Sequence, residues 1–379
     1  MVSDPILSVA FDATALLDRP TGIGVFVQEL LTGLAARPDV QARAFAVSFR
    51  GRGRLAQRVP AGVAVHSRPV PARLARLAWQ HTNHPTAGWL AGPTDVVHGP
   101  NYVVPPGAGA AEVVTVSDLS AIRFPELCNA DVLQWPHLLT RALARGAWVH
   151  TISESVGDEV RTLYPAAAER VIAVPIAVRR PAAPTPQTDA SRGRHMAGGD
   201  RYVLALGTVE PRKDLPSLVA AFDALAGEDP DLRLVVAGPD GPGVVALTEA
   251  RDRARHRNRI VRLGWVDDAQ RLALLRGASV VAYASRYEGF GLVPLEALAV
   301  GTPVVATAVG ALPEVLADGG LLVQPGDVDA LAGALSLVLA DESVRSGLLE
   351  RGAARVDAYG WEATVDGVVG LYRRAADAR

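Results

Sequence analysis

A regular alternation of short apolar runs with longer helical patterns is the feature that most restricts how this chain can fold. The short runs are rich in β-branched residues, and the patterns between them are long enough for crossover helices. Such alternation is typical of parallel sheets that are covered by helices on both faces. In the first half of the chain the expected strands are Ile6–Phe11, Ala42–Val47, Val63–His66, Asp95–His98, Glu112–Val116, Trp148–Ile152 and Val171–Val174.

The alternation restarts after residue 200, which predicts a second sheet. Its expected strands are Tyr202–Gly207, Leu232–Gly238, Ile260–Leu263, Val280–Ala284, Pro303–Thr307 and Gly320–Val323. Residues 179–200 have no apolar period and are expected to be a linker. The length of 379 residues and the hydrophobic content of 49% suffice for two cores. We therefore predict an α/β protein with doubly wound domains at residues 1–178 and 201–358. The helix expected within 359–379 either ends the second domain or crosses back to the first.

Charge and cysteine content exclude several classes of protein. The 38 Lys+Arg and 40 Asp+Glu residues give a net charge of -2, and no signature of nucleic-acid binding is present. Cys128 is the single cysteine, which excludes a disulfide framework and a CxxC site. The longest uncharged apolar stretch, from Ala297 to Pro313, is interrupted by glycine and proline and is too short to span a bilayer. The first residues do not resemble a signal peptide, so we expect a cytoplasmic protein.

One stretch departs from this charge balance, because no acidic residue lies between Asp39 and Asp95. The stretch is either a solvated basic face or a docking surface for an anionic lipid or a phosphorylated acceptor. Leu74, Leu77 and Trp79 would add apolar contact to such a surface. Its arginines are Arg43, Arg50, Arg52, Arg54, Arg58, Arg68, Arg73 and Arg76.

The loop after the expected strand Tyr202–Gly207 carries two adjacent cations, Arg212 and Lys213. Ligands of doubly wound sheets bind outside the carboxyl ends of the strands, where this loop lies. Lys213 is the only lysine in the chain, which suggests that a compact ammonium is needed at this position. The pair is interpreted as a clamp for a diphosphate, and a solvated surface turn is the alternative.

A second loop, after the strand Val280–Ala284, contains Glu288 and Glu296 separated by seven residues. Gly289 and Gly291 allow a ligand to approach the backbone amides, and Pro294 suits the first turn of a following helix. Glu296 is then expected in the opening turn of that helix, with the two carboxylates flanking the amides. Helix capping would explain Glu296 but would leave Glu288 without a role.

The turn Thr21–Gly24, which precedes a helix expected from about Val25, is a weaker candidate for phosphate binding. Its glycines, Gly22 and Gly24, would present free backbone N–H groups at the positive end of the helix dipole. Glycine turns before helices are common, so an ordinary helix start explains the turn equally well.

The block from Glu288 to Glu296 continues with Gly301-Thr-Pro303 and with Gly310–Glu314, and in this form it resembles the retaining glycosyltransferases of family four. That family has the GT-B fold, in which two Rossmann-like domains face a central cleft. The resemblance runs from about Leu7 to Tyr372. Supporting matches are Glu210–Lys213, Gly264–Val266, Thr21–Gly24, Ser117–Leu119 and Phe124–Glu126.

The resemblance implies that the C-terminal domain holds a nucleotide-diphosphate sugar and that the N-terminal domain holds the acceptor. Arg212 and Lys213 would neutralise the leaving diphosphate, and Glu288 would bind hydroxyls of the donor sugar. Asp118 would lie near the sugar and the acceptor, and Glu296 would bind the ribose. The other residues expected at the donor are Gly22, Gly24, Gly207, Trp265, Val266, Gly289, Phe290, Gly291 and Leu292. No metal is expected, and the anomeric configuration would be retained by front-face attack.

The chain departs from the family pattern at two positions. Thr208 stands where the family often has an arginine, so the diphosphate role is assigned to Arg212. Ser117 stands where the family often has a histidine before the aspartate. His98 and His150 follow strands of the first domain and are expected to be structural or lining residues.

We therefore predict a retaining, metal-independent hexosyltransferase of polysaccharide biosynthesis, with GDP-mannose as the first choice of donor. Its acceptor would be a glycan or a polyprenyl-linked sugar, and residues Arg43 to Arg76 would provide peripheral contact with the inner face of the plasma membrane. An epimerase or hydrolase of nucleotide sugars, or a non-catalytic scaffold that binds them, remains the alternative. A nicotinamide dehydrogenase is excluded, because no Gly-x-Gly-x-x-Gly follows the first strand of either domain.

Overall fold

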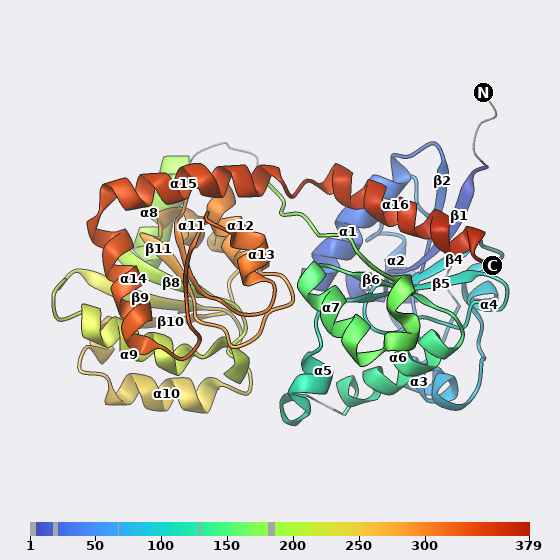
Figure 1. The fold of residues 1–379 in the computed structure, drawn as a ribbon, viewed down its shortest axis with the longest axis horizontal. Coiled ribbons are helices and arrows are strands. Elements are labelled where there is room, and N and C mark those ends of the chain that lie inside the picture. Colours follow the sequence, from blue (N-terminus) through green and yellow to red (C-terminus); the bar gives the residue numbers. More distant parts are fainter. Residues whose placement is uncertain (1–4, 18–21, 67, 129, 181–185) are drawn as a thin grey trace. The chain divides into compact units, whose positions relative to one another are not determined.

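The computed structural model describes residues 5–17, 22–66, 68–128, 130–180 and 186–379. It divides into two compact units (Figure 1). The first unit consists of Met1–Ala177 together with Gly360–Arg379, and the second consists of Val178–Tyr359. Within the described residues, each unit is built around one parallel sheet flanked by helices.

The sheet of the first unit has the strand order β3-β2-β1-β4-β5-β6-β7. The order reverses between β1 and β4, which are hydrogen-bonded neighbours. In a doubly wound sheet such a reversal opens a crevice at the carboxyl ends of the two strands. The strands are β1 Leu7–Asp12, β2 Val40–Phe45, β3 Ala64–Val65, β4 Val96–Gly99, β5 Ala111–Val116, β6 Trp148–Thr151 and β7 Val171–Ala173. The α-helices are α1 Gly22–Ala35, α2 Arg52–Leu55, α3 Ala72–His81, α4 Ala87–Ala91, α5 Ser120–Arg123, α6 Trp135–Ala144, α7 Glu154–Leu163 and α16 Trp361–Asp377.

The sheet of the second unit has the strand order β10-β9-β8-β11-β12-β13 and reverses between β8 and β11. Its strands are β8 Arg201–Leu206, β9 Leu232–Ala237, β10 Ile260–Gly264, β11 Val280–Tyr283, β12 Val304–Thr307 and β13 Leu321–Val323. Its α-helices are α8 Pro186–Ala197, α9 Leu215–Leu225, α10 Val244–Arg253, α11 Asp268–Gly277, α12 Leu292–Ala299, α13 Leu312–Leu316, α14 Val328–Ala340 and α15 Glu342–Asp357.

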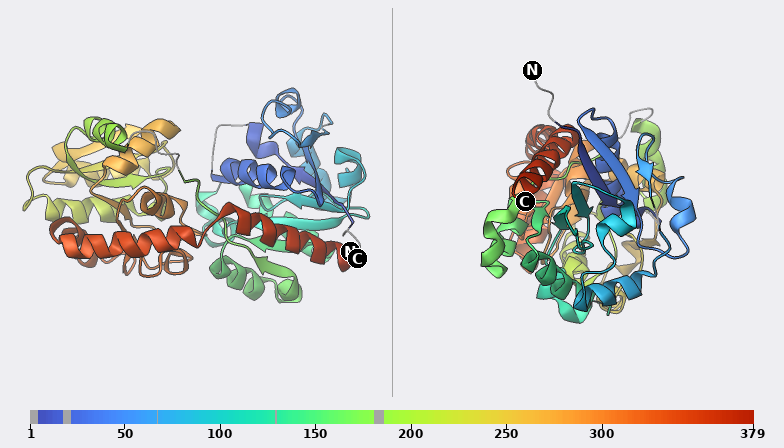
Figure 2. Two further views of the ribbon diagram at one scale, coloured as in Figure 1. Left: turned by 90° about the horizontal axis from the view of Figure 1, so that it is seen from above. Right: turned by 90° about the vertical axis from the view of Figure 1, so that its right-hand side faces the viewer.

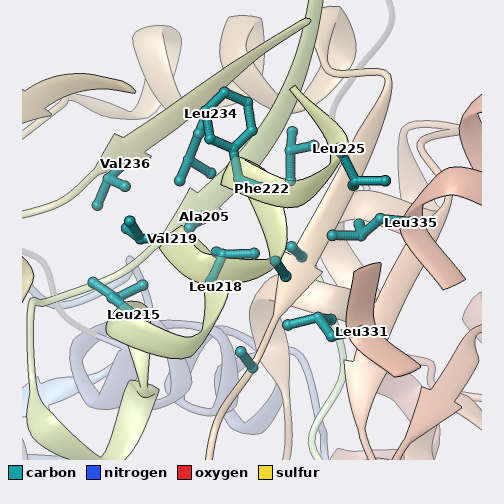
Figure 3. Close-up of a cluster of buried hydrophobic side chains, with 14 of the residues drawn as sticks. Ala205, Leu215, Leu218, Val219, Phe222, Leu225, Leu234, Val236, Leu331 and Leu335 are labelled. Atoms are coloured by element: carbon teal, nitrogen blue, oxygen red, sulfur yellow. The ribbon is translucent and has the colours of Figure 1, made fainter. Parts of the chain in front are cut away.

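The core of the second unit lies where α9 and α14 pack against the sheet (Figure 3). Leu218 and Phe222 of α9 are buried beside Leu234 of β9, and Leu331 and Leu335 of α14 belong to the same cluster. Side chains of this size each contribute about 1.5–3 kcal/mol when they are fully buried. This packing makes the sheet a rigid base for the loops at its carboxyl edge.

Helix α16 belongs to the first unit, although it follows the whole second unit in the sequence. It packs on α1 and on β4, β5 and β6 (Figures 1 and 2). The approach to α1 is close, because a Cβ at Gly33 would lie 2.2 Å from Cγ2 of Val365. The hydroxyl of Thr364 donates to the carbonyl of Pro175 at 2.8 Å, and Arg373 pairs with Asp39 at 2.9 Å. Of the two positions considered for this helix, the structure therefore has the one on the N-terminal unit.

A chain of hydrogen bonds ties α16 to the centre of the first sheet. His150 Nε2 donates to the carbonyl of Val174, which leaves Nδ1 to accept from the hydroxyl of Thr115. That hydroxyl then accepts from His98 Nε2, and His98 Nδ1 accepts from the hydroxyl of Tyr372. The carbonyl can only accept, so it sets the direction of every bond in the chain.

The two histidines in this chain of hydrogen bonds, His98 and His150, are fully buried, as expected for structural residues. Burial lowers the pKa of His150 to about 4, because a charged imidazole would lose its hydration. Burial lowers the pKa of His98 well below its ordinary value, and the neighbouring His150 acts in the same direction. The two rings are therefore neutral at physiological pH.

The linker expected at residues 179–200 is corrected by the structure, although part of it, residues 181–185, lies outside the described residues. Residues 186–197 form α8, which packs closely against α11 of the second unit. Glycines permit the contact: a Cβ at Gly193 would lie 2.0 Å from the carbonyl oxygen of Ala273, and one at Gly277 would lie 2.8 Å from that of Ala190. Close packing of small residues gives no apolar period, which is why the sequence pattern missed this helix.

Among the described residues, no helix is long and apolar enough to cross a membrane.

Candidate active site

The two loops singled out by the sequence meet at the carboxyl edge of the second sheet. Arg212 and Lys213 end a short 3-10 helix, Pro211–Lys213, in the loop after β8. Glu288 lies in the loop after β11, which is the strand next to β8. The cluster therefore occupies the point where the strand order reverses.

Three side chains donate hydrogen bonds to one oxygen of Glu288, Oε1. Lys213 Nζ lies at 2.5 Å, and Arg212 Nη1 and Ser285 Oγ each lie at 2.8 Å. Arg212 is further held by Glu210, whose Oε2 accepts from Nε at 2.7 Å. Glu288 is 7% exposed, so this is a buried, charge-assisted network. A hollow of about 10 Å³ remains beside it.

The environment of the cluster sets the protonation of its members. Burial acts to raise the pKa of Glu288, but the cations of Lys213 and Arg212 outweigh it, and the pKa is lowered. Burial lowers the pKa of Lys213, because desolvation of the ammonium exceeds the stabilisation by Glu288. A carboxylate and two cations share this small volume. An arriving anion would find two donors that are already aligned.

Tyr283 and Ser285 were missed by the sequence analysis. Tyr283 is the last residue of β11; its ring centroid lies 4.1 Å from Lys213 Nζ, and its hydroxyl bonds to the same nitrogen. A cation over an aromatic face is stabilised by the ring quadrupole. Position supplied a signal for both residues, since they stand at the carboxyl end of the strand that leads to Glu288.

Gly291, in the Glu288 loop, and Gly310, in the loop after β12, both have positive φ angles. Gly291 has φ +108° and caps the N-terminus of α12. Gly310 has φ +49°, and a Cβ there would lie 2.1 Å from the carbonyl oxygen of Glu288. Phe290 is buried and packs edge-on against Tyr359, with ring centroids 5.4 Å apart. The loop is therefore held from both sides.

Glu296 lies one turn further into the helix than expected. No acidic residue occupies the first turn of α12, which begins at Leu292, and Glu296 makes no cap. Its carboxylate instead pairs with Arg271 of α11, which the sequence analysis did not identify. Burial raises the pKa of Glu296, and Arg271 opposes the shift. The helix-capping interpretation is thus wrong, and the side chain stays part of the ligand-binding hypothesis.

The remaining residues predicted at the donor in this unit lie at the same edge of the sheet. Gly207 follows β8 with φ +139°, and a Cβ at Gly238 would lie 2.0 Å from its carbonyl oxygen. Trp265 and Val266 directly follow β10, and the indole of Trp265 is 55% exposed. The family resemblance implies that Gly264–Val266 borders the base of the donor, and this role stays a prediction.

The other predicted residues belong to the first unit. Gly22 is the first residue of α1, three residues earlier than the expected start, and Gly24 is buried within that helix. Thr21 lies outside the described residues. Asp118 follows β5, and its Oδ1 accepts from the backbone N–H of Ser120 at 2.9 Å and from the hydroxyl of Tyr102 at 3.3 Å. No cluster of His, Cys, Asp and Glu in the described part of the chain could hold a metal ion.

Comparison with known proteins identifies the family. Residues 187–355 match the model of the glycosyl transferases group 1. The chain is 31% identical over 287 residues to the O-antigen chain mannosyltransferase B of Escherichia coli, which covers 73% of this chain and 74% of the relative. It is 37% identical over 184 residues to the phosphatidyl-myo-inositol mannosyltransferase of Mycolicibacterium smegmatis, covering 47% of this chain and 46% of the relative.

Solved structures agree on the fold. The sucrose-phosphate synthase of Thermosynechococcus elongatus superposes with a TM-score of 0.71 at 21% identity, over 98% of this chain and 99% of that one. The fold is that of the GT-B glycosyltransferases. The chain belongs to the glycosyl transferases group 1 family and is a hexosyltransferase.

Proposed function

We propose that this enzyme moves a hexose, with mannose as the first choice, from a nucleotide-diphosphate sugar to a hydroxyl of a glycan or lipid-linked acceptor. The observation that carries the proposal is the convergence of Arg212 and Lys213 on Glu288 at the strand reversal of the second sheet. Mannose is favoured because two of the relatives are mannosyltransferases.

The cluster suggests how donor binding would proceed. Without a ligand, the cations are neutralised by Glu288. A diphosphate would take over the hydrogen bonds of Arg212 and Lys213, and Glu288 would turn its carboxylate to the hydroxyls of the sugar. A charge pair at 4 Å is worth about 4 kcal/mol at an effective dielectric constant near 20, which is enough to stabilise a departing diphosphate.

In the proposed reaction the bond between the anomeric carbon and the phosphate oxygen breaks, and a bond from that carbon to the acceptor oxygen forms on the same face. The proton of the acceptor hydroxyl passes to the leaving phosphate oxygen. The two cations carry the charge that develops on the diphosphate, so the proposed mechanism needs no metal.

The test has two parts. Thermal unfolding is first measured with GDP, UDP and dTDP, because a bound nucleotide stabilises the fold by mass action. The matching donor is then incubated in EDTA with mannose-terminated glycans, and sugar incorporation is followed together with the anomeric configuration of the product. We expect one nucleotide to stabilise the protein and the product to retain configuration. Release of free hexose with no incorporation would instead indicate a hydrolase, and inactivity restored by a divalent cation would contradict metal independence.

We also propose that the enzyme is cytoplasmic and makes peripheral contact with the inner face of the plasma membrane through α3. Leu74 and Leu77 are 62% and 53% exposed on this helix, beside the exposed Arg73. A basic helix with exposed leucines suits an anionic lipid surface. Not every arginine of the basic stretch is available to lipid, because Arg43 donates to the carbonyl of Pro93 and Arg76 pairs with Asp131.

Sedimentation with anionic liposomes at low salt tests this contact. The double variant Leu74→Ser/Leu77→Ser should lose most of the bound fraction, and Val245→Ser, at an exposed position in the second unit, should not change it. Equal sedimentation of the two variants, or none by the wild type, would exclude α3 as the contact.

A further inference from the structure

The first unit has a crevice of its own, at the strand reversal between β1 and β4. Asp12 is the last residue of β1, and Asn101 follows β4. Helix α3 contributes Arg76 and Trp79 to the wall, and α6 contributes Trp135. The volume is about 270 Å³. Ile23, between the predicted donor residues Gly22 and Gly24, lines it, but none of the residues to which the proposed donor binding gives a role does.

Two polar groups of this crevice have hydrogen-bonding capacity that the described residues do not use. Asp12 accepts from the backbone N–H of Thr14 at 2.9 Å and from its hydroxyl at 2.5 Å, and both bonds end on Oδ1. Oδ2 makes no hydrogen bond within the described part of the chain. Arg76 donates from Nη2 to Asp131 at 3.1 Å, while its buried Nε has no partner among the described residues. One acceptor and one buried donor in the wall of the crevice thus have no partner among the described residues.

The two indoles of the crevice are fixed by their own contacts. Trp79 is 3% exposed and donates from Nε1 to the carbonyl of Pro85 at 2.9 Å. Trp135 stacks on Tyr102, with ring centroids 5.2 Å apart and an interplanar angle of 28°. Rigid aromatic surfaces suit the C–H faces of a sugar ring, and a neighbouring donor and acceptor without partners suit its hydroxyls.

Charge distinguishes a neutral ligand from an anionic one. The cation of Arg76 is already paired with Asp131. Burial raises the pKa of Asp12, and the hydrogen bonds from Thr14 and the charge of Arg76 oppose the shift. A phosphate in this crevice would lie against a buried carboxylate and find no unpaired cation on Arg76. A polyol would instead supply an O–H to Asp12 and accept from Arg76.

We propose that this crevice binds one neutral sugar ring of the acceptor, with Asp12 accepting a hydrogen bond from a sugar hydroxyl and Arg76 donating one. A volume of about 270 Å³ lies near the lower end of the range of small-molecule pockets, about 300–1,000 Å³, which suits a ligand of the size of one pyranose. The inference rests on the proposed function and specifies its acceptor, a glycan end and not a polyol phosphate.

The experiment measures binding of methyl pyranosides of mannose, glucose and galactose to the full chain by saturation-transfer NMR. Each is compared with its 6-phosphate. The variant Asp12→Asn keeps the shape of the side chain and an oxygen for Thr14, but replaces the acceptor Oδ2 with an amide donor. Asp158→Asn, an exposed aspartate of α7 in the same unit, is the matched control.

We expect at least one neutral pyranoside to bind the wild type and the control. We expect its Kd to rise about tenfold or more in Asp12→Asn, because a hydrogen bond to a charged group is lost. Its 6-phosphate should bind more weakly. Equal Kd values in the two variants, tighter binding of the phosphate, or no binding of any pyranoside at millimolar concentration would overturn the inference.

Nucleotide-dependent thermal stabilisation, measured on the same samples, separates this result from the proposed function. We expect Asp12→Asn to keep the full nucleotide response, because the residue lies in the other unit. Lost pyranoside binding with an intact nucleotide response supports the inference. Absence of any nucleotide response in the wild type would instead contradict the donor site, whatever the pyranosides do.

Discussion

The two units use the same topological position for different chemistry. Each sheet reverses its strand order beside its first strand, and each reversal carries a group of functional side chains. In the second unit these are two cations on one carboxylate, Glu288, and a hollow of about 10 Å³ lies beside Lys213. In the first unit they are one carboxylate, Asp12, and two indoles around about 270 Å³. If both proposals hold, the fold sets the place for a ligand in each unit, and the side chains set whether that ligand is an anion or a neutral ring.

The strongest test of this contrast is removal of the compact cation. Lys213→Ala should lower kcat by about a thousandfold, since preorganised charge at a developing anion is worth that much. Lys213→Arg should also be impaired, because the larger guanidinium does not fit the buried position that the compact ammonium of Lys213 occupies beside Glu288 and Tyr283. Initial rates of sugar transfer check both variants, with circular dichroism as the folding control. Full activity of Lys213→Arg would show that only charge matters there.

Removal of the carboxylate should separate sugar recognition from diphosphate recognition. Glu288→Gln is expected to lower transfer about a hundredfold and to leave nucleotide binding intact or stronger, because its two cations are released to the diphosphate. The variant should also lose about 3 kcal/mol of stability, since buried charges are left without their partner. Calorimetry with the nucleotide and urea unfolding measure the two effects. Weaker nucleotide binding would contradict the role assigned to Glu288.

As the pH falls, the first unit should lose stability at a higher pH than the second. His150 has a folded pKa of about 4 and an ordinary value of 6.5, so the unfolded chain takes up the proton first as the pH falls. The free energy of unfolding therefore falls from about pH 6.5 downward, and the loss reaches about 3 kcal/mol near pH 4. The pKa of Glu288 is lowered in the folded protein from its ordinary value of 4.5. Its contribution to the stability of the second unit is therefore complete above about pH 4.5 and is lost only at lower pH.

Hydrogen exchange of the two units between pH 7 and pH 4 tests this order. Peptides from the first sheet should lose protection at a higher pH than peptides from the second. Simultaneous loss of protection in both units, or earlier loss in the second, would contradict the assignment.

The smallest expected effect concerns the missed tyrosine. Tyr283→Phe removes a hydroxyl from Lys213 but keeps the ring over which the ammonium lies. Transfer should fall about fivefold, since one hydrogen bond contributes about 1 kcal/mol. Tyr283→Leu removes the ring as well, and the rate of sugar transfer should be lower still in this variant. Equal rates of the two variants would show that the ring does not hold the ammonium.

Much of the fold could be predicted because its signals are local. Every expected strand overlaps a strand of the described structure, within one or two residues at most ends. The place of Arg212, Lys213 and Glu288 at the carboxyl edge of the second sheet followed from the rule that ligands of doubly wound sheets bind there, but their direct contact was not predicted. The likeness to the glycosyltransferase family added the expected roles, which stay predictions.

What the sequence did not reveal depends on contacts between distant segments. Helix α8 is stabilised by glycines that meet α11, and such contacts leave no periodic pattern. Arg271 was missed because its partner, Glu296, lies on another helix, and the choice of partner depends on side-chain rotamers. The crevice of the first unit draws Trp79 and Trp135 from separate helices onto the end of β1. Neither tryptophan lies near Asp12 in the sequence.

The position of α16 has a consequence for synthesis of the protein. A ribosome makes residues 178–359, the whole second unit, before it makes this helix. The second unit can therefore close its core while the first still lacks α16. Until that helix is made, Gly33 of α1 has no contact with Val365, and His98 has no hydrogen bond from Tyr372. Although the N-terminal unit is translated first, it is the last to complete its core, and until then the apolar surface that α16 covers stays exposed.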